Sequence, residues 1–324
     1  MEFEGNHECD SSMSPNGGLT MDSNTGLSMG SKGNDEFPLP VLVCIAKLEQ
    51  NYIKEFVHYH LALGFSRIYL FDNEDVPTYA DILRTYIDAG KLVVTHLPGN
   101  NHSVINDAGQ QMFIPVQYLA LHIFTQQIMP DPQITHVAHI DIDEFIVLKK
   151  HNNICEFINE YIKGDCAGIG MNWRFFGSSF NNDPITKPVV ERFTMCAEKG
   201  DKHIKTIFRK DRFLQFDGCH TIKTKSGHIK STDGTIIVGP YNQMAPIDVI
   251  QVNHYKCKTL AEFRYIRTRM RADVVGGPKE DVDADFKKYD INEVEDLSLR
   301  EQRELTYVLP KAKQRCHQRW HLCP

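Results

Sequence analysis

Acidic side chains interrupt an apolar run in the segment VAHIDIDEFIVL, from Val137 to Leu148. Carboxylates in a buried strand are costly unless something offsets their charge. Asp141 and Asp143 are two positions apart, so on a regular strand both side chains point the same way. A divalent cation relieves the repulsion between two converging carboxylates, and oxygen ligands favour Mg²⁺ or Mn²⁺. The Asp-x-Asp pattern therefore predicts a metal site that clamps a diphosphate; a pair of surface acids at a strand end is the alternative.

Polar residues also follow other apolar segments that we expect to be strands, among them Lys47, Glu49, Asp72 and Asn73. The expected strands before the acidic segment are 41–46, 67–73 and 92–98, and the expected helices are 50–63, 79–89 and 115–128. This alternation predicts an α/β chain with a parallel sheet and right-handed crossovers. Because ligands bind outside the carboxyl ends of such strands, we expect these polar side chains to converge on one rim.

The pattern becomes looser after Leu148, where we expect a short helix at 154–162, a strand at 168–177 and helices at 260–272 and 297–308. We expect residues 37–150 to form a nucleotide-binding half and residues 151–324 to build the other wall of the same cleft. Residues 1–36 are rich in Ser, Gly, Asn, Met and Asp, and this composition is typical of disorder.

Composition narrows the classes of function. The chain has 324 residues, of which 41% are hydrophobic and 24% charged, as in soluble globular proteins. Its formal net charge of −6 argues against a general nucleic-acid binder. The cysteine count of nine is odd and no pair has C-x-x-C spacing, which indicates a reducing compartment. No apolar window approaches the roughly 20 residues of a membrane span, and the acidic start is unlike a signal peptide, so we expect a cytoplasmic protein.

Several sequence blocks follow one another between Val41 and Asp273, and in this order they resemble glycosyltransferase family 92. They are CIAKLEQNYIKEFVHYHLALGFSRIYLFDNED, HIDIDEF, NWRFFGSS, ERF, HIKTIFR, a lone His220, and NHYKCKTLAEF. The resemblance implies a GT-A fold, a Rossmann-like fold with a mostly parallel central sheet flanked by helices. It also implies an inverting, metal-dependent transfer of a sugar, galactose or xylose, from a UDP-sugar to a glycan hydroxyl. Eukaryotic members are anchored in Golgi membranes; this chain looks more like a soluble, cytosolic or virus-encoded relative.

The resemblance assigns Asp141 and Asp143 to Mn²⁺ or Mg²⁺ and, through the ion, to the donor diphosphate. It assigns His254, which follows the apolar segment VIQVNHY, as the third protein ligand. A lone histidine is more often a hydrogen-bonded core residue, and this is the alternative. Glu144 is expected either to accept hydrogen bonds beside the metal or to pair with a cation.

The nucleotide is expected at the ends of the first two strands. In this fold Asp72 and Asn73 would meet the uridine, although Asp and Asn also cap loops routinely. Lys47 and Glu49 follow the same logic for the first strand. Glu49 could instead be an acid favoured by the dipole at the start of a helix.

The second half supplies further binding candidates. Lys205 and Arg209 face one way on an extended strand and could hold phosphate or an acidic acceptor; a solvated strand face is the alternative. Trp173 offers an aromatic face to a sugar, and its alternative is a core position. The turn after it, with Ser178 and Ser179, lets backbone N–H groups approach the acceptor.

An inverting transfer needs a base that takes the acceptor's proton. Position in the chain favours Asp217, with His220 beside the acceptor, over Asp183 and Glu191. Two other functions compete with the transferase. A sugar-nucleotidyltransferase usually has a Gly-rich loop after the first strand, where this chain has AKLEQNY. A non-catalytic carbohydrate-binding module would keep the fold alone.

Overall fold

The computed structural model describes residues 38–105, 109–182, 185, 187–269, 272 and 281–302. All of them belong to one unit, Phe37–Pro324. The expected disorder of residues 1–36 and the end of the expected helix at 297–308 lie outside the described residues. Within the described ranges, no helix is long and apolar enough to cross a membrane.

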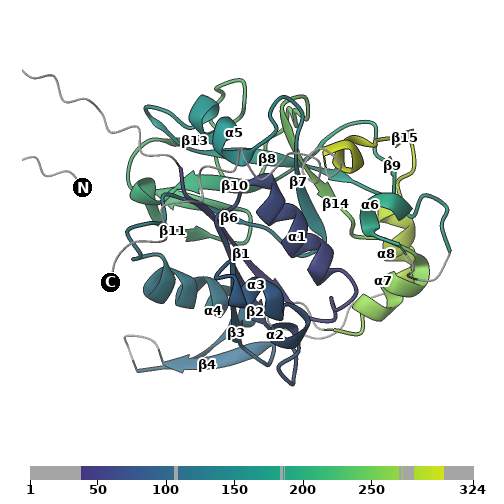
Figure 1. The fold of residues 1–324 in the computed structure, drawn as a ribbon, viewed down its shortest axis with the longest axis horizontal. Coiled ribbons are helices and arrows are strands. Elements are labelled where there is room, and N and C mark those ends of the chain that lie inside the picture. Colours follow the sequence, from purple (N-terminus) through teal and green to yellow (C-terminus); the bar gives the residue numbers. More distant parts are fainter. Residues whose placement is uncertain are drawn as a thin grey trace, which may run out of the picture. The chain divides into compact units, whose positions relative to one another are not determined.

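A mixed nine-stranded sheet forms the centre of this unit (Figure 1). Its order is β3-β2-β1-β6-β10-β8-β14-β7, and β13 pairs with β8. The strands are β1 (Pro40–Ala46), β2 (Arg67–Asp72), β3 (Leu92–His96), β6 (His136–His139), β7 (Glu144–Leu148), β8 (Cys166–Phe175), β10 (Asp201–Arg209), β13 (His228–Lys230) and β14 (Ile250–His254). From β3 to β6 all neighbours are parallel, and β10 and β7 add antiparallel pairs. The predicted α/β class with a mostly parallel sheet is confirmed.

Helices cover both faces of the sheet, which explains why β1 is an uninterrupted apolar run. Leu42 and Cys44 belong to a core cluster that contains the buried face of α1 (Ile53–Leu63). Val41 and Val43 point the other way, into a cluster that contains residues of α4 (Val116–Ile123). The other helical elements are α2 (Tyr79–Ile82), α3 (Arg84–Asp88), a π-helical turn (Phe124–Ile128), α5 (Ile154–Tyr161), α6 (Val189–Arg192), a 3₁₀ turn (Lys210–Arg212), α7 (Leu260–Ile266) and α8 (Val282–Tyr289). Residues 298–302, where the described part of the chain ends, are also helical.

Most expected elements form, with altered bounds. The helix at 50–63 is α1, and it ends at Gly64, whose φ of 113° glycine adopts at little cost. The single helix expected at 79–89 is instead the two short helices α2 and α3. Three two-stranded pairs lie outside the main sheet. They are β4 (Asn101–Ile105) with β5 (Gln111–Pro115), β9 (Met195–Cys196) with β15 (Val294–Glu295), and β11 (Phe213–Asp217) with β12 (Thr221–Thr224).

The acidic segment differs most from expectation. It is two strands in different parts of the sheet, because β6 pairs with β1 and β10 whereas β7 pairs with β14. Asp141 and Asp143 therefore lie in the turn between the two strands and not on a regular strand. We call residues 141–143 the D-x-D turn. The crossover carries both carboxylates past the end of β6, at the rim where parallel strands leave space for ligands.

Candidate functional site

A cavity of about 520 Å³ lies beside the D-x-D turn, and both halves of the chain line it. We call it the D-x-D cavity. The residues predicted from sequence that line it are Lys47, Glu49, Asn73, Asp141, Asp143, Trp173, His220 and His254. The other polar and charged residues that line it are Gln117, Asp201, His203, Cys219, Lys256, Arg267, Arg269, Lys288 and Tyr289. The convergence of strand-end polar residues from β1, β2 and β6 agrees with the expected rim.

Asp143 lies beside the end of β14. Its carboxylate oxygen Oδ2 is 3.5 Å from Nε2 of His254, and its carbonyl accepts a 2.8 Å hydrogen bond from the Tyr255 N–H. Burial alone would raise the pKa of Asp143, but His254, Lys258 and Arg269 outweigh it, so the pKa is lowered and the group stays ionised. Nδ1 of His254 is buried and has no hydrogen-bond partner among the described residues.

Asp141 is held from beneath by a buried cation. Nζ of Lys205 lies 2.8 Å from Asp141 Oδ2 and 3.6 Å from Glu144 Oε2. Burial opposes the charge of Lys205, but the two acids outweigh it and raise its pKa. Gln117 donates to the other carboxylate oxygen of Asp141 at 3.2 Å. Lys205 itself is fully buried and does not line the D-x-D cavity, so it supports the turn from below.

Glu144 fixes the shape of the turn. Its Oε2 accepts a 3.0 Å hydrogen bond from the Asp141 N–H, and its own N–H donates to the Asp141 carbonyl at 3.1 Å. Burial raises the pKa of Glu144 well above its usual value. Of the three acids, Glu144 is therefore the one that holds the turn, and Asp141 and Asp143 are the ones that reach the cavity.

The donor atoms at the turn fit a divalent cation by type. Two carboxylates and an imidazole line one cavity, and these are donors that Mn²⁺ accepts. The Asp141 side chain is 35% exposed, so part of its carboxylate is open to the cavity. Among the described residues, however, no group of three His, Cys, Asp or Glu side chains is already arranged around one point as metal ligands. Lys205 and His254 hold the two carboxylates instead.

Glu49, which follows β1, lies beside two cationic side chains. Arg269 Nη1 lies 3.1 Å from Glu49 Oε1, and Lys258 Nζ lies 4.0 Å from Oε2. Burial raises the pKa of Glu49, and the two cations oppose that effect. Arg269 also donates to the carbonyl of Lys47, whose own side chain pairs with Asp75 at 3.0 Å. Glu49 thus ties the segment after α7 to the first strand.

Asp72 and Asn73 play different parts. The Asp72 carboxylate accepts hydrogen bonds from the N–H groups of Glu74, Thr78 and Tyr79 at 3.1, 2.8 and 3.0 Å. It caps the following loop, the alternative considered above, and does not line the D-x-D cavity. Asn73 does line the cavity, and its amide donates to the carbonyls of Leu97 and Gly99.

Trp173 lines the D-x-D cavity, whereas Ser178 and Ser179 do not. The Trp173 indole N–H is buried and has no partner among the described residues. Ser179 Oγ accepts from the N–H groups of Thr194 and Met195, each at 2.8 Å. Ser178 Oγ accepts from the Phe180 N–H. The two serines therefore hold a loop in shape rather than facing this cavity.

Of the residues predicted as the base or beside the acceptor, only some line the D-x-D cavity. His220 lines the cavity, and its Nδ1 donates to the Ile204 carbonyl at 2.9 Å. Burial and Lys205 lower the pKa of His220 to about 4. Asp217 is exposed on β11, away from the cavity lining. Glu191 also lies away from the cavity lining, and Asp183 lies outside the described residues.

Arg209 pairs with Asp211 through hydrogen bonds of 2.9 and 2.6 Å and does not line the D-x-D cavity. Its expected companion Lys205 points to the D-x-D turn instead. Lys205 and Arg209 therefore do not form the shared binding surface that was expected, and neither lines the cavity.

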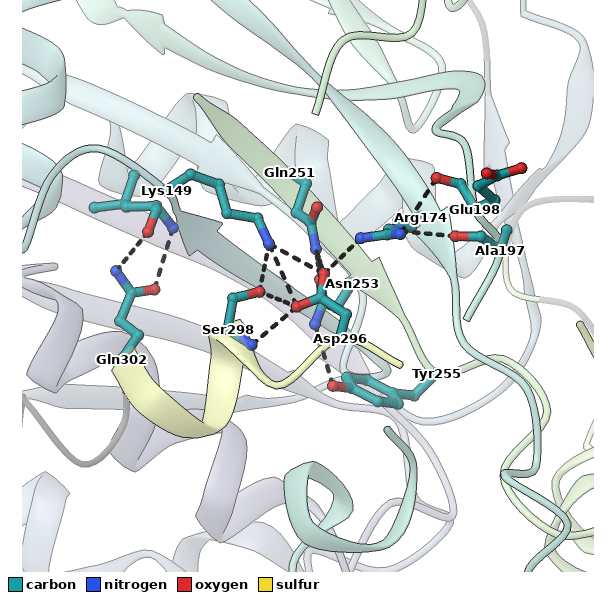
Figure 2. A network of polar contacts seen from close by, with 11 residues as sticks. Lys149, Arg174, Ala197, Glu198, Gln251, Asn253, Tyr255, Asp296, Ser298 and Gln302 are labelled. Carbon is teal, nitrogen blue, oxygen red and sulfur yellow. Dashed lines mark hydrogen bonds and ion pairs between the residues drawn. The ribbon is translucent and has the colours of Figure 1, made fainter. Parts of the chain in front are cut away.

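Figure 2 shows a largely buried polar network centred on Asp296. Oδ2 of Asp296 forms ion pairs with Nη1 of Arg174 at 2.6 Å and with Nζ of Lys149 at 3.0 Å. It also accepts a 3.0 Å hydrogen bond from Nε2 of Gln251. Gln251 also donates to Asn253. Arg174 alternates along β8 with Trp173 and Phe175, so the network holds the back of the strands whose front lines the cavity.

Comparison with known proteins gives one family. Residues 40–296 match the family model described as glycosyltransferase family 92. None of the curated proteins compared with the chain matches it. Among solved structures, S. aureus TarS 1-349 is 15% identical over 53% of this chain and 47% of its own, with a TM-score of 0.30. Its complex with UDP is 14% identical over 53% and 46%, with a TM-score of 0.29. The chain spans less than half the length of these proteins.

Proposed function

Because the chain belongs to glycosyltransferase family 92, we propose that this glycosyltransferase moves a sugar from a UDP-sugar, UDP-galactose or UDP-xylose, to a glycan hydroxyl. The transfer inverts the anomeric carbon and depends on Mn²⁺ or Mg²⁺. One observation carries the proposal: the carboxylates of the D-x-D turn and several cationic side chains line one cavity. In this proposal residues 37–324 are one catalytic domain, with the donor on 37–150 and the acceptor on 151–324.

The cationic side chains suit a diphosphate. Those lining the D-x-D cavity are Lys47, Lys256, Arg267, Arg269 and Lys288. A diphosphate leaving group gains negative charge as the glycosidic bond breaks, and preorganised cations stabilise that charge. Arg267 and Arg269 are already placed by Asp285 and Glu49, at 3.3 and 3.1 Å, so little side-chain freedom remains to be lost on binding.

Asp141, Asp143 and His254 are the residues that would hold the divalent cation. When bound, such an ion neutralises charge on the leaving diphosphate. Lys205 keeps Asp141 in place and ionised, and Asn73 and Lys47 border the space for the uridine. Trp173 lines the cavity and would border the sugar, although the residue is only 9% exposed.

A donor screen tests the proposal. Purified protein with Mn²⁺ is incubated with UDP-, GDP- and TDP-sugars, and release of free nucleotide is followed without any acceptor. We expect slow hydrolysis of one UDP-sugar, and we expect EDTA to stop it. If none of the sugar nucleotides is hydrolysed and calorimetry detects no UDP binding, the proposal is refuted. Release of pyrophosphate from a nucleoside triphosphate would point to a nucleotidyltransferase instead.

A further inference from the structure

His203 and Asp201 form a pair that the sequence reading did not single out. Nδ1 of His203 lies 2.5 Å from Oδ1 of Asp201, and both side chains line the D-x-D cavity. The same carboxylate oxygen accepts the His203 backbone N–H at 2.9 Å. Because a carboxylate accepts, Nδ1 carries the proton, and Nε2 is left with the lone pair.

A β-bulge in β10 sets the direction of the Asp201 and His203 side chains. The register between β10 and β8 shifts between Asp201 and Ile204, and Asp201 lies opposite Trp173. Such bulges redirect side chains and are frequent beside active sites. The His203 ring stacks on Trp173 with centroids 4.9 Å apart and planes at 21°. The bulge thus places an oriented imidazole on the wall of the cavity.

Trp173 lies between this pair and the D-x-D turn. Its ring contacts His254 at a centroid distance of 4.4 Å, and His254 in turn is beside Asp143. His203 and the proposed diphosphate site are therefore separated by one indole ring. A sugar bound in the cavity beside that ring would have its leaving group near the turn and its opposite side near His203.

His220 is a poorer base than His203. Its ring is close to that of His203, with centroids 5.6 Å apart, but its Nδ1 donates to a backbone carbonyl and not to a carboxylate. Buried Lys205 lowers the pKa of His220 further, so its imidazole binds protons weakly. Among the described residues, the titratable groups in contact with the His203 ring are Asp201, His220 and Tyr241, and the Lys202 ammonium lies over the Tyr241 ring.

We propose that His203, oriented by Asp201, is the base that accepts the proton of the acceptor hydroxyl. This inference rests on the proposed function. The acceptor oxygen forms its bond to the anomeric carbon while its proton passes to Nε2 of His203. The bond from that carbon to the donor phosphate breaks, and its electron pair leaves with the nucleoside diphosphate. The His203 side chain is 30% exposed, so the imidazolium can return the proton to solvent.

The test compares variants with UDP-galactose or UDP-xylose, Mn²⁺ and p-nitrophenyl glycosides as acceptor probes. His203→Gln should lose about 10²- to 10⁴-fold in turnover, the usual contribution of a general base. Its Mn²⁺-dependent UDP binding, measured by calorimetry, should stay unchanged. His228→Gln, an exposed histidine on β13 outside the cavity, is the matched control and should keep full activity.

Two further readouts separate catalysis from packing. Added imidazole should restore turnover to His203→Ala, which a purely structural role would not allow. In Asp201→Asn, kcat should fall with an unchanged donor KM, because the amide no longer fixes the proton on Nδ1 of His203. Asp201 is thus tested as a positioning residue.

The outcomes are distinguishable. A wild-type protein that neither turns over nor binds UDP contradicts the proposed function. An active wild-type protein whose His203→Gln variant is equally active overturns this inference alone. ¹⁵N NMR of labelled histidines is independent of activity: it should find His203 protonated at Nδ1, and protonation at Nε2 alone would also overturn the inference.

Discussion

The ammonium group of Lys205 lies 2.8 Å from the carboxylate of Asp141, although the Lys205 side chain is completely buried. The sequence pattern predicted that a divalent cation would relieve the repulsion between Asp141 and Asp143. In the structure a lysine from β10 offsets part of that charge from inside the core. The D-x-D turn is therefore held in shape by the protein itself, and a metal ion would bind to carboxylates that are already placed.

Removing this lysine should destabilise the fold. In Lys205→Met, Asp141 loses its counterion; because its side chain is 35% exposed, the loss should be smaller than the roughly 3–5 kcal/mol of a fully buried pair. Urea denaturation at pH 7 should register the loss. Lys223→Met, at an exposed position on β12, should change stability little. Equal stability of the two variants would mean that Lys205 is not the counterion of the turn.

Asp143→Asn tests the metal site directly. The substitution keeps the shape of the side chain but removes the charge that a divalent cation needs, so Mn²⁺ should no longer strengthen UDP binding. Calorimetry with and without Mn²⁺ measures the effect. Asp248→Asn, on an exposed side chain paired with Lys150, is the control and should bind as the wild type does. Undiminished Mn²⁺ dependence in Asp143→Asn would remove this residue from the metal site.

Asp296→Asn tests the network behind the cavity. The variant leaves Lys149 and Arg174 without their shared carboxylate, and because Asp296 is only 7% exposed the loss should be about 3–5 kcal/mol. The back of β8 and β14 also loses support, so turnover should fall together with stability. Asp165→Asn breaks a surface pair with Lys230 and should have little effect on either. A stable Asp296→Asn protein would show that the remaining hydrogen bonds suffice.

The sequence predicts the first half of the fold well because its strands are buried on both faces. Val41, Leu42, Val43 and Cys44 alternate between two cores, and such a run has few other interpretations. The D-x-D turn was misread for a related reason. Ile140 and Ile142 are both buried, so the apolar pattern continues through a crossover between two strands as if through one strand.

The candidate site was predicted only in part. Residue types and spacing pointed to Asp141 and Asp143, and the family resemblance pointed to His254; all three line one cavity. Asp72 carried an equally good signal, but its carboxylate is used by three backbone N–H groups. His203 was missed because its direction depends on a bulge in β10, and one sequence has no periodic signal for a bulge.

Buried histidine should make the protein sensitive to mild acid. His60 is fully buried between α1 and β7, where its Nδ1 donates to the Phe56 carbonyl at 2.9 Å and its Nε2 accepts from the Ile146 N–H at 3.4 Å. The bond from Ile146 requires the neutral ring, because a protonated Nε2 cannot accept. Burial lowers the pKa of His60 from 6.5 to about 3. The unfolded chain therefore binds a proton below pH 6.5 that the native protein does not bind until about pH 3.

The contribution of neutral His60 to the free energy of unfolding is complete above pH 6.5. It is lost as the pH falls toward 3, at up to about 1.4 kcal/mol per pH unit. Urea denaturation at pH 7, 6 and 5 measures it. His60→Gln lacks the titrating group, so its stability should fall less steeply with pH than that of the wild type, whatever its stability at pH 7. His228→Gln, which removes an exposed histidine, should keep the wild-type slope. Parallel curves for the wild type and His60→Gln would mean that His60 does not stay neutral in the fold.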